Sequence, residues 1–87
     1  MFQSQALHSS RSPAGDAAAA QKLFKLGMMC ATGAGALDLV SAHKWFNLAA
    51  IHGSKLAGAL RAEIAAELSE GEIAAAQRAA RDWLASQ

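Results

Sequence analysis

Apolar residues recur at intervals of three and four along most of the chain, which is the spacing that lines one face of an α-helix. No segment alternates apolar and polar residues with the period of two expected of a half-buried strand. The pattern predicts an all-α fold with four helices, over residues of about 16–32, 38–52, 55–67 and 70–85. Residues 1–12 are polar and aperiodic, and we expect a flexible leader there, before a helical domain over residues 13–87.

Signals for helix ends agree with these boundaries. Residues suited to cap the four N-termini are Asp16, Asp38, Ser54 and Ser69, with Pro13 as an alternative start of the first helix. Ser69 and Glu72 have the spacing of a capping box. The glycine pair Gly33 and Gly35 is expected to break the first helix, and Gly53 to end the second.

The four helices are expected to form two antiparallel hairpins. The step from the first helix to the third is about 38 residues, which is within the range of helical repeat units. The second hairpin reproduces neither the glycine pair nor the Trp and Phe of the first. We therefore interpret it as a degenerate hairpin that caps a single repeat.

Each helix has an expected buried face. These faces consist of Ala19, Leu23, Leu26, Gly27 and Cys30 in the first helix, Ala42, Trp45, Phe46, Ala49 and His52 in the second, Leu56, Ala57, Leu60, Ile64 and Leu68 in the third, and Ile73, Ala76, Ala80, Trp83 and Leu84 in the fourth. A glycine inside a helix costs about 1 kcal/mol relative to alanine, so Gly27 indicates that another helix passes very close. The alanines at 42, 49 and 50 would supply the matching small surface, and Trp45 the largest apolar area.

Composition limits the classes of partner. The chain has 87 residues, with 53% hydrophobic and only 6% aromatic residues, and alanine makes up the difference. The formal net charge of +1 provides no strong field to attract nucleic acid or an anionic membrane. One cysteine cannot form an internal disulfide, and the first 15 residues lack the apolar core of a signal peptide. These features favour a cytoplasmic protein with no nucleic-acid or membrane partner.

Reactive residues do not form a convincing site in the sequence. Gly33 and Gly35 lack the preceding strand and the Gly-Lys-Ser/Thr ending of a phosphate loop. Cys30 lies on a face expected to be packed, where thiols are usually inert. The histidines have no metal-ligand spacing; we expect His43 to be solvated and His52 to contact the carbonyl end of its helix. The sequence predicts no enzyme, cofactor or metal.

The outward face of the first helix is a candidate partner site. It combines two basic and two thioether side chains, from Lys22, Lys25, Met28 and Met29. Methionine adapts its shape to different apolar partners, and the lysines would supply selectivity. The alternative is that this face is buried against the leader, another helix or a second copy of the chain.

The landmarks of the central stretch resemble the SEL-one-like repeat, a relative of the tetratricopeptide repeat. These landmarks are Leu26, Gly27, Gly33, Gly35, Asp38, Ala42, Trp45, Ala49, Ala50 and Gly53, within about residues 17–57. The third and fourth helices further resemble a C-terminal extension found in small bacterial members of this family. The family usually has an aromatic residue where Cys30 stands, and the loop from Gly35 to Asp38 is a residue shorter than usual.

The resemblance implies a short right-handed α-α superhelix of two antiparallel hairpins. It also implies a non-enzymatic adaptor or scaffold that binds a protein or peptide in a bacterial regulatory or assembly role. One alternative is a homodimer formed through the uncovered face of the repeat. Another is a β-lactam-binding hydrolase, because some cysteine-rich relatives are described so; those relatives are secreted and disulfide-linked, which does not match this chain.

Overall fold

The structure, a computed structural model, describes residues 16–33 and 37–87 and is all-α over these two ranges. The helices are α2 (Ala17–Thr32), α3 (Leu39–Ile51), α4 (Lys55–Ala65) and α5 (Glu70–Ala85), and the described residues contain no strand. The all-α prediction is confirmed, and the helix ends lie within two residues of those expected from the sequence. The predictions for the leader, for Pro13 and for Gly35 concern residues outside the described ranges.

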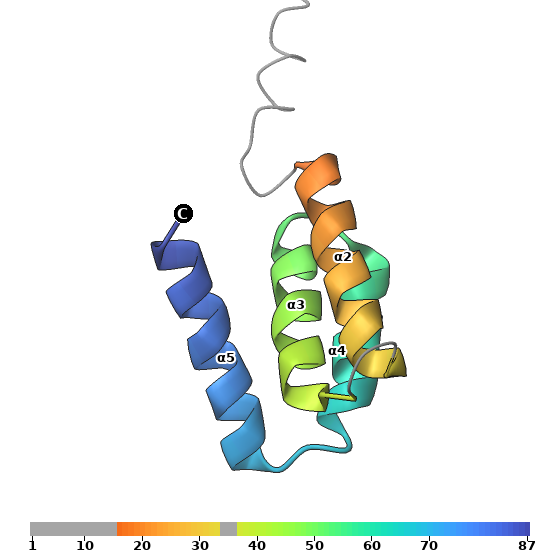
Figure 1. The fold of residues 1–87 in the computed structure, drawn as a ribbon, viewed down its shortest axis with the longest axis vertical. Coiled ribbons are helices and arrows are strands. Elements are labelled where there is room, and N and C mark those ends of the chain that lie inside the picture. Colours follow the sequence, from red (N-terminus) through yellow and green to blue (C-terminus); the bar gives the residue numbers. More distant parts are fainter. Residues whose placement is uncertain (1–15, 34–36) are drawn as a thin grey trace, which may run out of the picture.

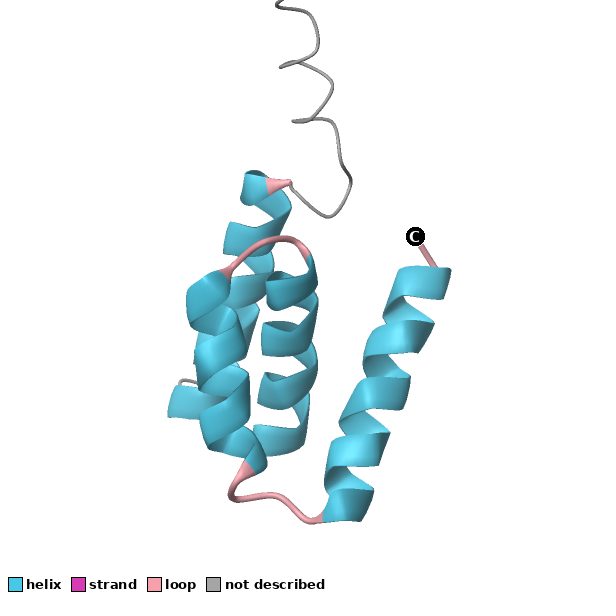
Figure 2. Cartoon of the chain, turned by 180° about the vertical axis from the view of Figure 1, so that it is seen from behind, coloured by secondary structure: helices cyan, strands magenta, loops and turns pink. Residues whose placement is uncertain are grey.

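Helix α3 is the centre of the fold. The other three helices each pack against it, with α2 and α4 on one side and α5 on the other (Figures 1 and 2). Successive helices run in opposite directions, so the α3–α4 connection and the α4–α5 connection lie at opposite ends of the molecule (Figure 1). α5 therefore follows α4 in the second hairpin but packs mainly against α3 of the first hairpin.

The N-terminal caps expected from the sequence are all present. The carboxylates of Asp16 and Asp38 and the hydroxyls of Ser54 and Ser69 each accept a hydrogen bond from a backbone N–H of the first helical turn. Glu72 completes the capping box, because its Oε1 accepts a hydrogen bond of 2.9 Å from the backbone N–H of Ser69. These bonds satisfy amide groups that the helices themselves leave free.

Gly33 ends α2 in a left-handed conformation. Its φ angle is 72°, and its N–H donates to the carbonyl of Met29. Side chains with a Cβ rarely adopt this geometry, which explains why glycine stands here. Helix termination therefore accounts for Gly33 without a ligand.

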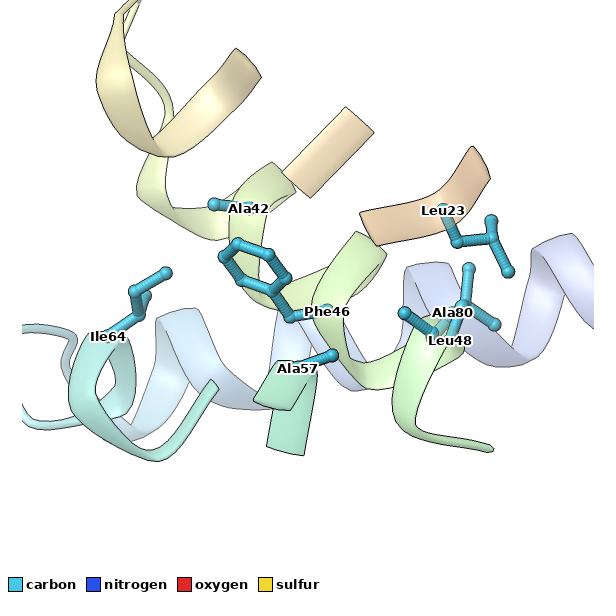
Figure 3. Close-up of a cluster of buried hydrophobic side chains, with 8 residues drawn as sticks. Leu23, Ala42, Phe46, Leu48, Ala57, Ile64 and Ala80 are labelled. Carbon is cyan, nitrogen blue, oxygen red and sulfur yellow. The ribbon is translucent and has the colours of Figure 1, made fainter. Parts of the chain in front are cut away.

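The close helix contact predicted at Gly27 exists, and its nearest partner is the ring of Phe46 on α3. A Cβ added to Gly27 would lie 2.6 Å from both Cδ1 and Cε1 of Phe46, so the aromatic ring itself rests on the glycine. Phe46 is only 1% exposed and lies in the buried cluster drawn in Figure 3. A ring on α3 therefore fills the space that the missing side chain leaves on α2, and Ala42 and Ala49 on α3 are fully buried.

Trp45 occupies a different place from the one predicted. It is partly buried, and its ring meets that of Trp83 on α5 edge-on, with centroids 6.1 Å apart and an interplanar angle of 83°. The ammonium of Lys44 lies 4.0 Å from the centroid of the Trp45 ring. Trp45 therefore joins α5 to α3, and Phe46 is the aromatic residue that joins α2 to α3.

Three apolar residues assigned to buried faces are exposed. Leu26 is 37% exposed, Leu56 is 60% exposed and Leu84 is 39% exposed. Within residues 16–33 and 37–87, each helix other than α3 packs mainly against α3, so its buried stripe is narrower than the periodicity alone indicates. Leu26 and Leu56 consequently become available for contacts with another molecule.

His43 was expected to be solvated, and this prediction was wrong. The side chain is only 3% exposed, and its Nδ1 is buried without a hydrogen-bond partner in the described part of the chain. The reason is the central position of α3, which is covered by helices on both sides. A wheel for a helix with a single buried face cannot represent this situation.

Candidate interaction surface

The candidate partner face of α2 is exposed. Lys22 and Lys25 are exposed, Met28 is 37% exposed and Met29 is 55% exposed. Leu26 lies four residues after Lys22 and belongs to the same outward surface, although the sequence placed it inside. The five residues form a surface with lysines toward the N-terminal half of α2 and apolar side chains toward its C-terminal half.

Apolar exposure is concentrated at this part of the molecule. Leu37, which is 65% exposed, lies beside Gly33 at the C-terminal end of α2. Four of the seven large apolar side chains that are exposed in the described ranges therefore fall between residues 26 and 37. Single exposed apolar residues are ordinary, but a group of them is typical of a contact surface.

An open groove of about 490 Å³ runs between the N-terminal half of α2 and the α3–α4 connection. Its lining consists of Ala17, Ala20, Gln21, Phe24, His52, Gly53, Ser54 and Leu56. A second hollow of about 370 Å³ lies on the other side of Gln21, and its lining includes Lys22 and Lys25. The second hollow therefore belongs to the exposed surface of α2, whereas none of the five residues of that surface lines the groove.

Two polar side chains in the wall of the groove have hydrogen-bond partners within the chain. His52 Nδ1 donates to the carbonyl of Leu48 at 2.9 Å, which agrees with the contact predicted for this residue. Ser54 Oγ accepts from the N–H of Ala57 at 3.1 Å. The Phe24 ring contacts the Phe46 ring at a centroid distance of 5.6 Å and is held by the core. What the groove offers a ligand is mainly apolar surface, from Phe24 and Leu56.

Sequence reasoning missed Phe24 and the exposed position of Leu56. Phe24 lies four residues after Ala20 and four before Met28, so it is at the edge of the buried face. Whether a residue at the edge of a helix face is buried depends on how the neighbouring segment packs over it. The apolar periodicity of a single helix does not give this information. The sequence signal was limited to the presence of a large aromatic residue near that edge.

Cys30 is in an environment that disfavours the reactive thiolate. Burial raises the pKa of its thiol, the nearby Asp38 carboxylate raises it further, and Lys44 lowers it in part. Since the thiolate is the nucleophile and metal ligand, this environment does not activate Cys30. Over residues 16–33 and 37–87, no three His, Cys, Asp or Glu residues lie close enough together to hold a metal ion.

None of the helices in the described ranges has the length and apolar character needed to cross a membrane. Comparisons with models of protein families, with curated proteins and with solved structures found no match. A proposal for the function therefore depends on the geometry of the α2 surface and the groove.

Stability is expected to fall on acidification below about pH 6.5, the ordinary pKa of histidine. Burial lowers the pKa of His43, and the nearby Arg61 guanidinium lowers it further. The unfolded chain therefore binds a proton at His43 more tightly than the folded chain does. The free energy of unfolding has its full value above the ordinary histidine pKa and decreases as the pH falls below it. Urea unfolding at several pH values between about 7 and 5.5 measures this slope.

The matched control is the non-titrating variant His43→Leu. If His43 is the source, the variant loses most of the slope over the same pH range, whatever its stability at neutral pH. An equal slope in both proteins would show that another group is responsible.

Proposed function

We propose that the chain is a non-enzymatic protein-protein interaction module, a small helical-repeat adaptor that presents α2 and its groove to a protein or peptide. The observation that supports this most strongly is the group of exposed apolar side chains at residues 26–37, next to an open apolar groove. The resemblance of the central stretch to the SEL-one-like repeat points to the same class of function.

The physical basis of binding would be burial of apolar side chains. Met28 and Met29 supply adaptable contacts, while Lys22 and Lys25 at the adjoining end of the surface discriminate among partners by charge. α2 is held in place by the Gly27–Phe46 contact and by its N-terminal cap, so the surface is built on a fixed helix. A preformed surface reduces the ordering that binding requires.

The double variant Met28→Glu, Met29→Glu tests this proposal. Both side chains are exposed, so the change is expected to leave the fold intact while it introduces two charges into the contact surface. In a pull-down from extracts of the source cell, at least one protein captured by the wild type is expected to be lost with the variant.

The matched control is Leu84→Glu, Ala85→Glu at the exposed C-terminal end of α5. Helix content of both variants is checked by circular dichroism. If the α2 variant retains every captured protein and is folded, or if the α5 variant loses the same proteins, the α2 surface is not the binding site.

A further inference from the structure

The groove between α2 and the α3–α4 connection is apolar, and its lining contains no Asp, Glu, Lys or Arg. Two of its polar side chains, His52 and Ser54, form hydrogen bonds within the chain. Its largest apolar side chains are Phe24 and Leu56, and Leu56 is 60% exposed. Burying a charged group in such surroundings is costly, so the groove favours an occupant whose contacting side chains are apolar and uncharged.

The groove starts at the point where the described chain enters the fold. Ala17, the first residue of α2, lines it, and the lining continues along the same face of the helix to Phe24. Asp16 has the extended backbone of an N-cap, with a φ angle of −75° and a ψ angle of 102°. The chain before α2 therefore leaves the helix axis beside one end of the groove.

The residues that precede α2 have the composition that the groove favours. Residues 1–10 contain no Asp, Glu, Lys or Arg, and the first of these residue types is Arg11. Phe2 and Leu7 are large apolar side chains within this uncharged run. Pro13 and Gly15, which stand between Leu7 and α2, are residue types that favour a reversal of chain direction.

The connection to α2 is long enough for these side chains to enter the groove. From Ala17 to Phe24 the groove lining extends along α2 by about 10 Å, at the rise per residue of an α-helix. The extended chain between Leu7 and Ala17 spans about 30 Å. Leu7 can therefore reach Phe24 even after the chain has reversed its direction, and Phe2 can reach further along the same surface.

From these observations we propose that residues 2–7 of the same chain occupy the groove. The apolar side chains of this segment, Phe2 and Leu7, lie against the apolar wall of the groove. The short tether gives an effective concentration in the millimolar range, so a contact with a dissociation constant of about 1 mM is formed about half of the time. The inference goes beyond the proposed function and does not depend on it, because the exposed surface of α2 contributes no residue to the groove. A partner that uses the groove has to displace this segment.

Other occupants match the groove less well. Ser86 and Gln87 follow α5, which packs on the opposite side of α3 from α2 (Figure 1). A second copy of the chain at micromolar concentration is about a thousandfold more dilute than the tethered segment. The exposed methionines of its α2 are accompanied by Lys22 and Lys25, and the groove lining has no acidic residue to receive these lysines.

A paramagnetic label near the segment tests the inference in the full chain. Ser9→Cys, made in a Cys30→Ala background, carries a nitroxide that broadens the amide NMR signals of residues close to it. The readout is the intensity of each signal before and after the nitroxide is reduced with ascorbate. Signals of residues 52–56, which belong to the far wall of the groove, are expected to lose about half of their intensity or more.

Two double variants of the labelled chain show whether the apolar side chains are responsible. Phe2→Ser, Leu7→Ser is expected to restore most of the lost intensity at residues 52–56. The matched control Gln3→Ser, Gln5→Ser changes two polar residues of the same segment and is expected to restore none.

A second pair of variants tests the wall of the groove. Leu56→Ala removes an exposed apolar side chain of the wall and is expected to restore part of the lost intensity. Leu84→Ala removes an exposed apolar side chain of α5 and is expected to leave the broadening as it is. Circular dichroism checks that both variants are folded.

Several results would overturn the inference. It is wrong if residues 52–56 are not broadened, if the serine variants of the apolar and of the polar pair behave alike, or if α5 is broadened equally. It is also wrong if isotope-labelled chain without nitroxide, mixed with unlabelled chain that carries it, is broadened as strongly, since the segment then comes from a second copy. None of these results affects the proposed function, whose test changes Met28 and Met29 outside the groove.

Discussion

Replacing Phe46 by alanine is expected to reduce the free energy of unfolding by about 3–5 kcal/mol. The ring is 1% exposed, it lies on Gly27 of α2, and it contacts Phe24. Its removal leaves a cavity between α2 and α3 that the backbone cannot close without moving a helix. Small domains have a total stability of about 5–15 kcal/mol, so this one change removes a large part of it.

Urea unfolding followed by circular dichroism measures the effect. Because Phe46→Ala can leave too little folded protein for a complete transition, Phe46→Leu provides a second point. It retains most of the apolar volume and is expected to cost less than about half as much as the alanine variant. An alanine variant as stable as the wild type would contradict the packing described for α2 and α3.

Gly27→Ala is expected to destabilise the fold by about 1–2 kcal/mol, although alanine is the better helix former by about 1 kcal/mol. The new Cβ would lie 2.6 Å from two atoms of the Phe46 ring, which is buried and has no space to retreat. Thermal or urea unfolding gives the difference from the wild type.

Two comparisons make the cause of this effect visible. Gly58→Ala is the same substitution inside α4, where the nearest atom to the new Cβ is Ala50 Cβ at an ordinary 3.9 Å, so it is expected to stabilise. In the background Phe46→Ala, the methyl group at residue 27 has room, and Gly27→Ala is expected to become stabilising. If the substitution at 27 has the same sign in both backgrounds, the ring is not what excludes the methyl group.

Local sequence signals predicted the helices and their ends well. Capping by Asp16, Asp38, Ser54 and Ser69 depends on bonds between residues two or three positions apart, so it can be read from spacing. The left-handed end at Gly33 is equally local. The close approach at Gly27 was also predicted from the position of this glycine inside a helix, although Gly58 in α4 shows that a helical glycine need not have such a neighbour.

The partner of each helix face was less predictable. The pattern LVSAHKWFNLAAI of α3 was interpreted as one apolar stripe, but three helices pack around it. That arrangement buries His43 and divides the two aromatic residues, with Phe46 facing α2 and Trp45 facing α5. Such assignments depend on contacts between helices that periodicity within one helix does not encode.

Only part of the candidate surface was predicted from the sequence, because the rest depends on how separate helices pack together. Lys22, Lys25, Met28 and Met29 are exposed as an outward face requires, although their role in binding stays a proposal. The groove was not foreseen, because it is formed by α2 together with the α3–α4 connection, more than 25 residues further along the chain. A surface built from two distant segments becomes visible only when the fold places them together.

The most direct test of a protein-binding surface on α2 is a map of the amides that a ligand perturbs. The backbone amide NMR spectrum of isotope-labelled chain is recorded during titration with a protein that the wild type captures and the Met28→Glu, Met29→Glu variant loses. The largest shift changes are expected at residues 17–29 of α2 and 52–56 of the α3–α4 connection, with α5 almost unchanged. Changes centred on α5 or on the α4–α5 connection, or a spectrum that the captured protein leaves unchanged, would contradict this account.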